Sequence, residues 1–250
     1  MHFYGSVLVV LVFLLETHAH AESYGERLET VWRHCKQYYK ENSVDKPSRF
    51  TNMRIGMFTR ESCWRNMFPK LKGRAAEVKH FGPALMKAFA TMMDTGNDDH
   101  HSIHLALQMS VNIDRILDDY PDAFTLPPRE AERFQGAVFI YLKHLTSLAS
   151  RFNSRGRMVF NITVKTHCLA HIGCRVHCLN PRRAWCFSGE RFMLIQRKIV
   201  ASCSRGTKLE EMNAKFLHRY RYALHSALIL RSILGIVLQM NVLRLGCLGG

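Results

Sequence analysis

The chain has 250 residues, of which 47% are apolar and 22% charged, and its formal net charge is +15. This composition allows an ordinary buried core and excludes the collagen-like, coiled-coil and disordered classes. The charge is uneven, because residues 1–150 hold 18 Lys and Arg against 17 Asp and Glu, whereas residues 151–250 hold 17 against 3. A basic half favours an anionic partner, which is nucleic acid, an anionic membrane surface or another polyanion. A basic domain without such a partner is the alternative.

The first 21 residues resemble a secretory signal peptide. Val7 to Leu15 is an unbroken apolar run, and Ala19-His20-Ala21 fits the small-x-small pattern of a cleavage site. The run is shorter than the roughly 20 residues that cross a bilayer. We therefore predict a signal peptide over 1–21, no transmembrane segment after its removal, and a secreted or lumenal location. A nuclear location is the alternative if the signal is not used.

The chain contains eight cysteines, and their meaning depends on the compartment. In an oxidising lumen they can pair as disulfides, whereas in the cytosol they are thiols with a possible metal site. The pairing cannot be derived from the sequence, because eight cysteines allow about 105 connectivities. Asn161 begins the one N-x-S/T sequon and is a glycosylation site if the chain is secreted.

The first half of the chain reads as a succession of helices. Apolar residues recur at helical spacing over 22–42, and again over 74–93. We expect a break near Phe81 in the second segment, because Pro83 inside a helix costs about 3 kcal/mol. Two further helices are predicted, one capped by Asn97 or Asp98 and running to about Asp119, and the clearest one over 129–152.

The second half is also predicted to be helical, with one short exception. Residues 158–164 alternate weakly and are the one plausible strand. Thr207 and Glu210 form a capping box that opens a helix toward Leu245, whose apolar end is a possible oligomer contact. The fold class predicted is mainly α, an irregular multi-helix bundle with at most one or two short strands near 158–164. A near-neutral region, 22–152, is expected to pack with the basic region, 153–250, as one domain.

The segment 160–192 is rich in residues that can bind metals or take part in catalysis. It holds four of the eight cysteines, three of the fourteen histidines and a lone acid, Glu190. Two pairs of metal-ligand type have a spacing of four, which places each pair on one helix face: His167 with His171, and Cys174 with Cys178. Such a set suits a structural zinc if the chain bends at Gly173. Packed thiols and surface histidines, or disulfides after secretion, are the alternative.

Three short motifs occur in order in this segment: K-T-H-x-x-x-H from Lys165, N-P-R-R-x-W-C from Asn180, and G-E-R-F from Gly189. Together they resemble the closing part of eukaryotic DDE-type transposases, which have an RNase H-like core. The resemblance implies that Glu190 corresponds to the last metal-binding glutamate, and that residues 71–152 match the helical insertion of those enzymes.

Catalysis is not expected, because two-metal phosphoryl transfer needs further aspartates on upstream strands. The aspartates between Asp94 and Asp122 all fall on predicted helices or turns, and none follows. No nucleophile elbow or Gly-rich phosphate loop is present either. The resemblance therefore implies a truncated piece in which Glu190 is a remnant. If the chain were active, Glu190 would serve metal-dependent phosphoryl transfer.

The favoured hypothesis is a non-catalytic, transposase-derived helical protein whose basic half binds DNA or another polyanion, without a cofactor unless zinc is bound. The predicted phosphate contacts are basic residues interleaved with aromatic ones: Lys165, Arg175, Arg182, Arg183, Arg191, Arg197 and Lys198. The alternative is a secreted, disulfide-stapled helical protein that binds a protein or an anionic surface.

Overall fold

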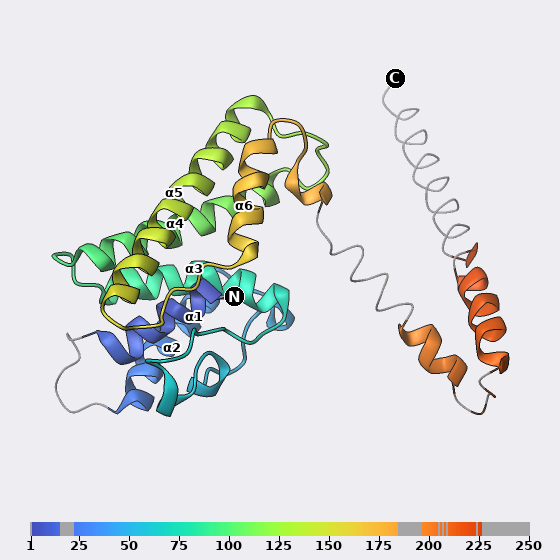
Figure 1. Cartoon of the computed structure of the whole chain (residues 1–250), viewed down its shortest axis with the longest axis horizontal. Helices are drawn as coiled ribbons and strands as arrows, with labels where there is room; N and C mark the ends of the chain where they lie inside the picture. Colours follow the sequence, from blue (N-terminus) through green and yellow to red (C-terminus); the bar gives the residue numbers. More distant parts are fainter. Residues whose placement is uncertain are drawn as a thin grey trace, which may run out of the picture. The chain divides into compact units, whose positions relative to one another are not determined.

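The computed structural model describes residues 2–15, 23–184, 197–204, 206, 208, 210–223 and 225–226. The chain divides into two units, residues 1–184 and residues 185–250. Both are helical, and the described ranges contain no strand, so the predicted mainly α fold is confirmed (Figure 1).

The first unit contains six α-helices among its described residues. The first of them continues directly into a π-helical turn, η1 (Val10–Leu14), and short 3-10 turns occupy several of the connections. The α-helices are α1 (His2–Val9), α2 (Tyr24–Glu41), α3 (Ala75–Met92), α4 (Asp98–Asp119), α5 (Pro128–Ser154) and α6 (Val164–Arg175). The 3-10 turns are η3 (Lys46–Ser48), η4 (Ile55–Met57), η5 (Glu61–Cys63) and η6 (Pro181–Ala184).

Local capping explains where two of the predicted helices begin. The Ser23 hydroxyl accepts from the backbone N–H of Glu26 (3.3 Å), and the Glu26 carboxylate accepts from the N–H of Ser23 (2.6 Å). This reciprocal pair satisfies free N–H groups in the first turn of α2. Asn97 caps α4 as predicted, because its side-chain oxygen accepts from the N–H groups of Asp99 and His100.

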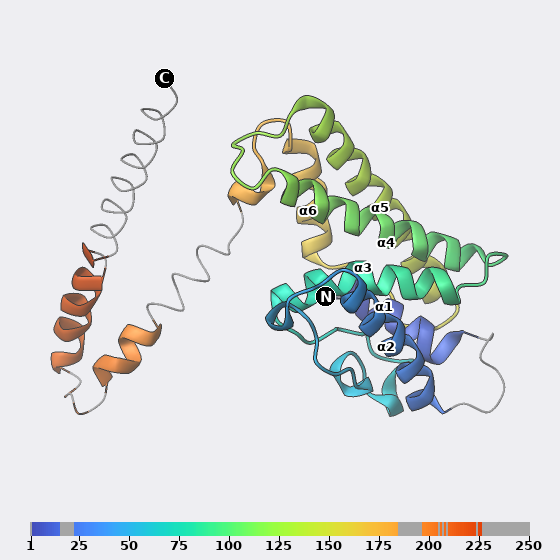
Figure 2. The same cartoon turned by 180° about the vertical axis from the view of Figure 1, so that it is seen from behind.

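The N-terminal segment lies in the core of the first unit. Its side chains at Val7, Leu8 and Leu11 are fully buried, and α1 lies close to α2 and α3 in both views (Figures 1 and 2). Polar contacts also fix it, since the Ser6 hydroxyl donates to the carbonyl of Val159 (2.6 Å). Cleavage after Ala21, the predicted processing site, would remove α1 and η1 from this core.

Two glycines permit the close approach of α1 to its neighbours. A Cβ at Gly5 would lie 2.9 Å from the backbone nitrogen of Leu71, and a Cβ at Gly82 would lie 2.4 Å from the Tyr4 hydroxyl. Contacts this short do not occur at real Cβ atoms. Glycine at these positions therefore lets α1 pack directly against the 70–71 connection and against α3.

The predicted break near Phe81 is wrong, because α3 continues through Pro83 without interruption. Proline removes one backbone hydrogen bond at this point. The side chains of Phe81, Leu85 and Phe89 are fully buried on either side of it. Tertiary packing of this apolar face therefore outweighs the local cost of the proline.

The predicted strand over 158–164 is also wrong. Residues 157–163 form an irregular connection, and α6 begins at Val164. The backbone N–H of Met158 donates to the carbonyl of Arg65 (3.1 Å), but no neighbouring extended segment continues the pairing in the part of the chain that is described. A strand needs such a ladder, whereas Val159 and Phe160 are instead buried as anchors in the helical core.

The second unit has two described helices, over 197–204 and over 210–223. Hydrogen bonds link the two helices, because the Arg219 guanidinium on the second donates to the carbonyl (2.9 Å) and the hydroxyl (2.6 Å) of Ser202 on the first. Thr207 and the apolar stretch before Leu245 lie outside the described residues. None of the described helices has the length and apolar character that crossing a bilayer requires.

Candidate nucleic-acid interface

Helix α6 packs on α5 through a glycine. A Cβ at Gly173 would lie 2.9 Å from a Val138 methyl carbon, so a larger residue there would push the two helices apart. The side-chain amide of Gln135 on α5 also donates to the Gly173 carbonyl (3.1 Å). Gly173 is the one buried residue of α6, so most of the helix surface faces solvent.

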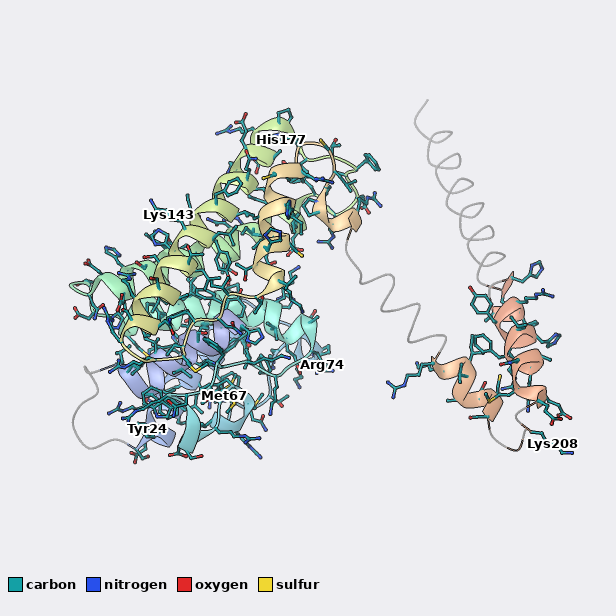
Figure 3. All side chains as sticks on the ribbon, in the orientation of Figure 1. Tyr24, Met67, Arg74, Lys143, His177 and Lys208 are labelled. Carbon is teal, nitrogen blue, oxygen red and sulfur yellow. The ribbon has the colours of Figure 1, made fainter. Side chains whose placement is uncertain are left out.

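The exposed side of α6 carries positive charge without any acid. Lys165, Arg175 and His177 are exposed, and no Asp or Glu occurs anywhere between residues 133 and 189. Lys143 on α5 and His177 just after α6 both extend away from the helical unit (Figure 3). A helix with exposed basic residues and no acidic ones attracts anions.

The structure brings together two of the four predicted zinc ligands. The Nε2 atoms of His167 and His171 lie 2.9 Å apart on exposed side chains, one turn apart on α6. Cys174 and Cys178 are exposed free thiols. Within the described ranges, no three His, Cys, Asp or Glu side chains lie where they could share a metal ion. The reason is that α6 continues past Gly173 to Arg175 without the bend that the predicted site needs.

The N-P-R-R motif forms a buried clamp on the connection between α4 and α5. Asn180 is fully buried, and its side-chain amide donates to the carbonyls of Tyr120 (2.9 Å) and Ala123 (3.0 Å). Its side-chain oxygen accepts from the backbone N–H of Arg182 (3.0 Å), and its own backbone N–H donates to the Phe124 carbonyl (2.8 Å). Asn180 therefore fixes the chain after α6 to the α4–α5 loop.

The two arginines of this motif also contact the fold, although Arg183 is exposed. The Arg182 guanidinium donates to the Asp118 carboxylate (2.8 Å) and to the Leu117 carbonyl (3.2 Å). Arg183 donates to the carbonyl of Asp122. These contacts give both arginines a partner within the fold. Lys165 and Arg175 are the predicted phosphate contacts of the first unit whose side chains have no such partner among the described residues.

The other predicted site residues lie in different parts of the chain. Arg197 and Lys198 are exposed at the start of the first helix of the second unit. Arg191 and Glu190, the predicted remnant of a catalytic site, lie outside the described residues. Asn161, in the sequon, is half-buried in the connection before α6.

Two arginines of the segment 133–189, which contains no Asp or Glu, pair with an aspartate from earlier in the sequence. Asp99, at the start of α4, is 8% exposed and pairs with Arg151 (3.1 Å) and Arg155 at the end of α5. A negative side chain in the first turn of a helix is favourable. This pair of bridges joins α4 to α5 and gives both arginines a partner within the fold.

Sequence reasoning did not identify the structural role of Asn180 or the setting of Asp114. The Asn-Pro dipeptide was a signal for the first, because asparagine before proline is typical of turns. Nothing in the spacing marked Asp114, since its surroundings come from helices far apart in the chain.

Comparisons with protein-family models, with curated proteins and with solved structures find no match for this chain.

Proposed function

We propose that the chain is a non-catalytic helical protein that binds the phosphate backbone of nucleic acid through the exposed face of α6. The observation that carries the proposal is that Lys165 and Arg175 are exposed on a helix that has no acidic residue. Arginine and lysine on such a surface contact phosphates and release the counterions condensed on the nucleic acid. The exposed histidines at 167, 171 and 177 can add hydrogen bonds to phosphate oxygens.

The contrast with the internally paired arginines supports this assignment. Arg151, Arg155 and Arg182 are paired with Asp99 or Asp118, whereas Lys165 and Arg175 have no hydrogen bond or ion pair with any described side chain. The order of the three motifs, which resembles the end of DDE-type transposases, favours nucleic acid over other polyanions. The basic residues Arg197 and Lys198 of the second unit extend the same chemistry to a separate surface.

Fluorescence anisotropy of a labelled DNA duplex tests the proposal. The double variant Lys165→Gln/Arg175→Gln is compared with Arg33→Gln/Lys40→Gln, which also removes one arginine and one lysine charge, from exposed positions on α2. We expect the first variant to lose several-fold to tenfold in affinity at low salt and the second to lose clearly less, because phosphate contacts are local.

Equal losses in the two variants would show that net charge alone drives binding, and would contradict an α6 interface. Absence of DNA and RNA binding at low salt, with binding to anionic lipid vesicles or to a sulfated polysaccharide, would contradict nucleic acid as the partner. That second outcome would favour the secreted, anionic-surface alternative.

A further inference from the structure

A pocket of about 310 Å³ opens between four helices of the first unit, and its lining includes no residue of α6. This volume is at the lower end of the range for small-molecule sites, which is about 300 to 1,000 Å³. Aromatic side chains from α1 and α5 form much of its wall, and α3 and α4 supply the rest. The lining residues are Phe3, Tyr4, Ala75, Val78, Lys79, Ser110, Asp114 and Tyr141.

The aromatic wall is built with specific geometry. The rings of Phe3 and Tyr141 meet edge to face, with centroids 5.3 Å apart. The Tyr4 hydroxyl lies 2.9 Å from the Ser110 hydroxyl, and Gly82 leaves the room that this hydroxyl needs beside α3. Burial raises the pKa values of the Tyr4 and Tyr141 phenols well above their ordinary value. Both phenols therefore stay neutral and serve as hydrogen-bonding or π surfaces.

The pocket contains one carboxylate that is not paired. Lys79 donates to Asp118 (2.5 Å), and Asp118 also accepts from Arg182 (2.8 Å), so the hydrogen bonds of both cations go to Asp118 and not to Asp114. Asp114, one turn before Asp118 on α4, has no hydrogen bond or ion pair with any described residue. Burial raises the pKa of the Asp114 carboxyl to about 6, while Lys79 lowers it and Asp118 raises it further.

An unpaired carboxylate under an aromatic wall has a defined complement. A desolvated carboxylate is costly unless it receives a counter-charge or hydrogen bonds. A protonated amine supplies both, and ring faces near the same site attract cations further. An anion would instead meet the charge of Asp114, and a purely apolar guest would leave the carboxylate without a partner.

We propose that this pocket, between α1, α3, α4 and α5, is a binding site for a small aromatic or aliphatic primary ammonium ion. The ammonium group donates to the Asp114 carboxylate and to the Ser110 hydroxyl, while the apolar part packs on Phe3 and Tyr141. The site is independent of the α6 face and of its proposed nucleic-acid partner.

Ligand-observed NMR titration of the full chain tests the site with phenethylammonium as the probe. The neutral 2-phenylethanol and the anionic phenylacetate serve as isosteric comparisons. At pH 7.5 we expect phenethylammonium to bind at least about tenfold more tightly than either comparison, which corresponds to about 1.4 kcal/mol. Asp114→Asn should reduce the affinity for phenethylammonium by a similar factor, whereas Asp119→Asn, at an exposed position of the same helix, should leave it unchanged.

A second pair of variants tests the pocket without touching its charge. Ala75 lines the pocket at an exposed position, so Ala75→Leu should block the probe, while Ala76→Leu on the neighbouring exposed position should not. Circular dichroism of each variant checks that the helical content is retained. Equal binding of all three probes, or equal loss in the two members of either variant pair, overturns the proposal.

Discussion

Leu8→Ala is the most informative single substitution in the N-terminal segment. Leu8 is fully buried, and its neighbours Val7 and Val9 are fully buried too. A leucine truncated to alanine in such a site loses its transfer free energy and leaves a cavity, at a cost of about 2.7 to 5 kcal/mol. Because Leu8 has no exposed surface, we expect a loss of about 3 kcal/mol in the free energy of unfolding.

The assay is urea denaturation followed by tryptophan fluorescence, with intact mass used to verify that residues 1–21 are present. Trp64 stacks on Phe13, with centroids 4.9 Å apart, so its emission reports on the packing of this segment. Leu14→Ala is the matched control, because Leu14 is only half-buried and its truncation should cost about 1 kcal/mol or less.

Equal denaturation midpoints for the wild type and Leu8→Ala, with an unchanged slope, would refute the reasoning. That result would mean that residues 2–15 contribute nothing to the core of the folded chain. It would then agree with a leader peptide that is dispensable after processing at Ala21.

Three further substitutions test other parts of the fold. Asn180→Ala removes three buried side-chain hydrogen bonds and should cost about 2 to 4 kcal/mol, measured by urea denaturation, whereas an unchanged midpoint would contradict the clamp. Gly173→Val should destabilise the packing of α6 on α5, seen as faster amide exchange in α6, and unchanged exchange would count against close packing at this glycine. Asp114→Asn should stabilise the chain by on the order of 2 kcal/mol above pH 6, because the raised pKa of Asp114 favours the protonated form in the folded state. The wild type therefore becomes less stable as pH rises from about pH 4 to pH 6, because the buried Asp114 carboxyl must lose its proton. The stability advantage of Asp114→Asn should vanish below pH 4, and a stability difference that does not vary with pH would contradict the titration of Asp114 as its cause.

Helix existence could be predicted well from the sequence, because periodicity and capping are local. Ser23 with Glu26, and Asn97 with the start of α4, place helix ends where the residue types require. The two errors arose where distant contacts decided the outcome. Pro83 stays within a helix because of its buried neighbours, and residues 158–164 lacked a partner strand, which no local pattern reveals.

The candidate sites were harder to predict for the same reason. The charge asymmetry and the spacing of His167 and His171 were visible in the sequence. The structure places these two histidines on the surface of α6. The inward use of Arg182 depends on Asp118, more than 60 residues earlier in the chain. The pocket around Asp114 combines four helices, so only the folded arrangement assembles it.

The salt dependence of DNA affinity tests the central claim most directly. Each phosphate contact on a duplex contributes about 0.9 to the slope of log affinity against log salt concentration. Lys165→Gln/Arg175→Gln should therefore lower the magnitude of the slope by about 1.8 relative to the wild type, while Arg33→Gln/Lys40→Gln leaves it unchanged. A wild-type affinity that does not vary with salt, or an equal slope in all three proteins, would contradict a phosphate-binding face on α6.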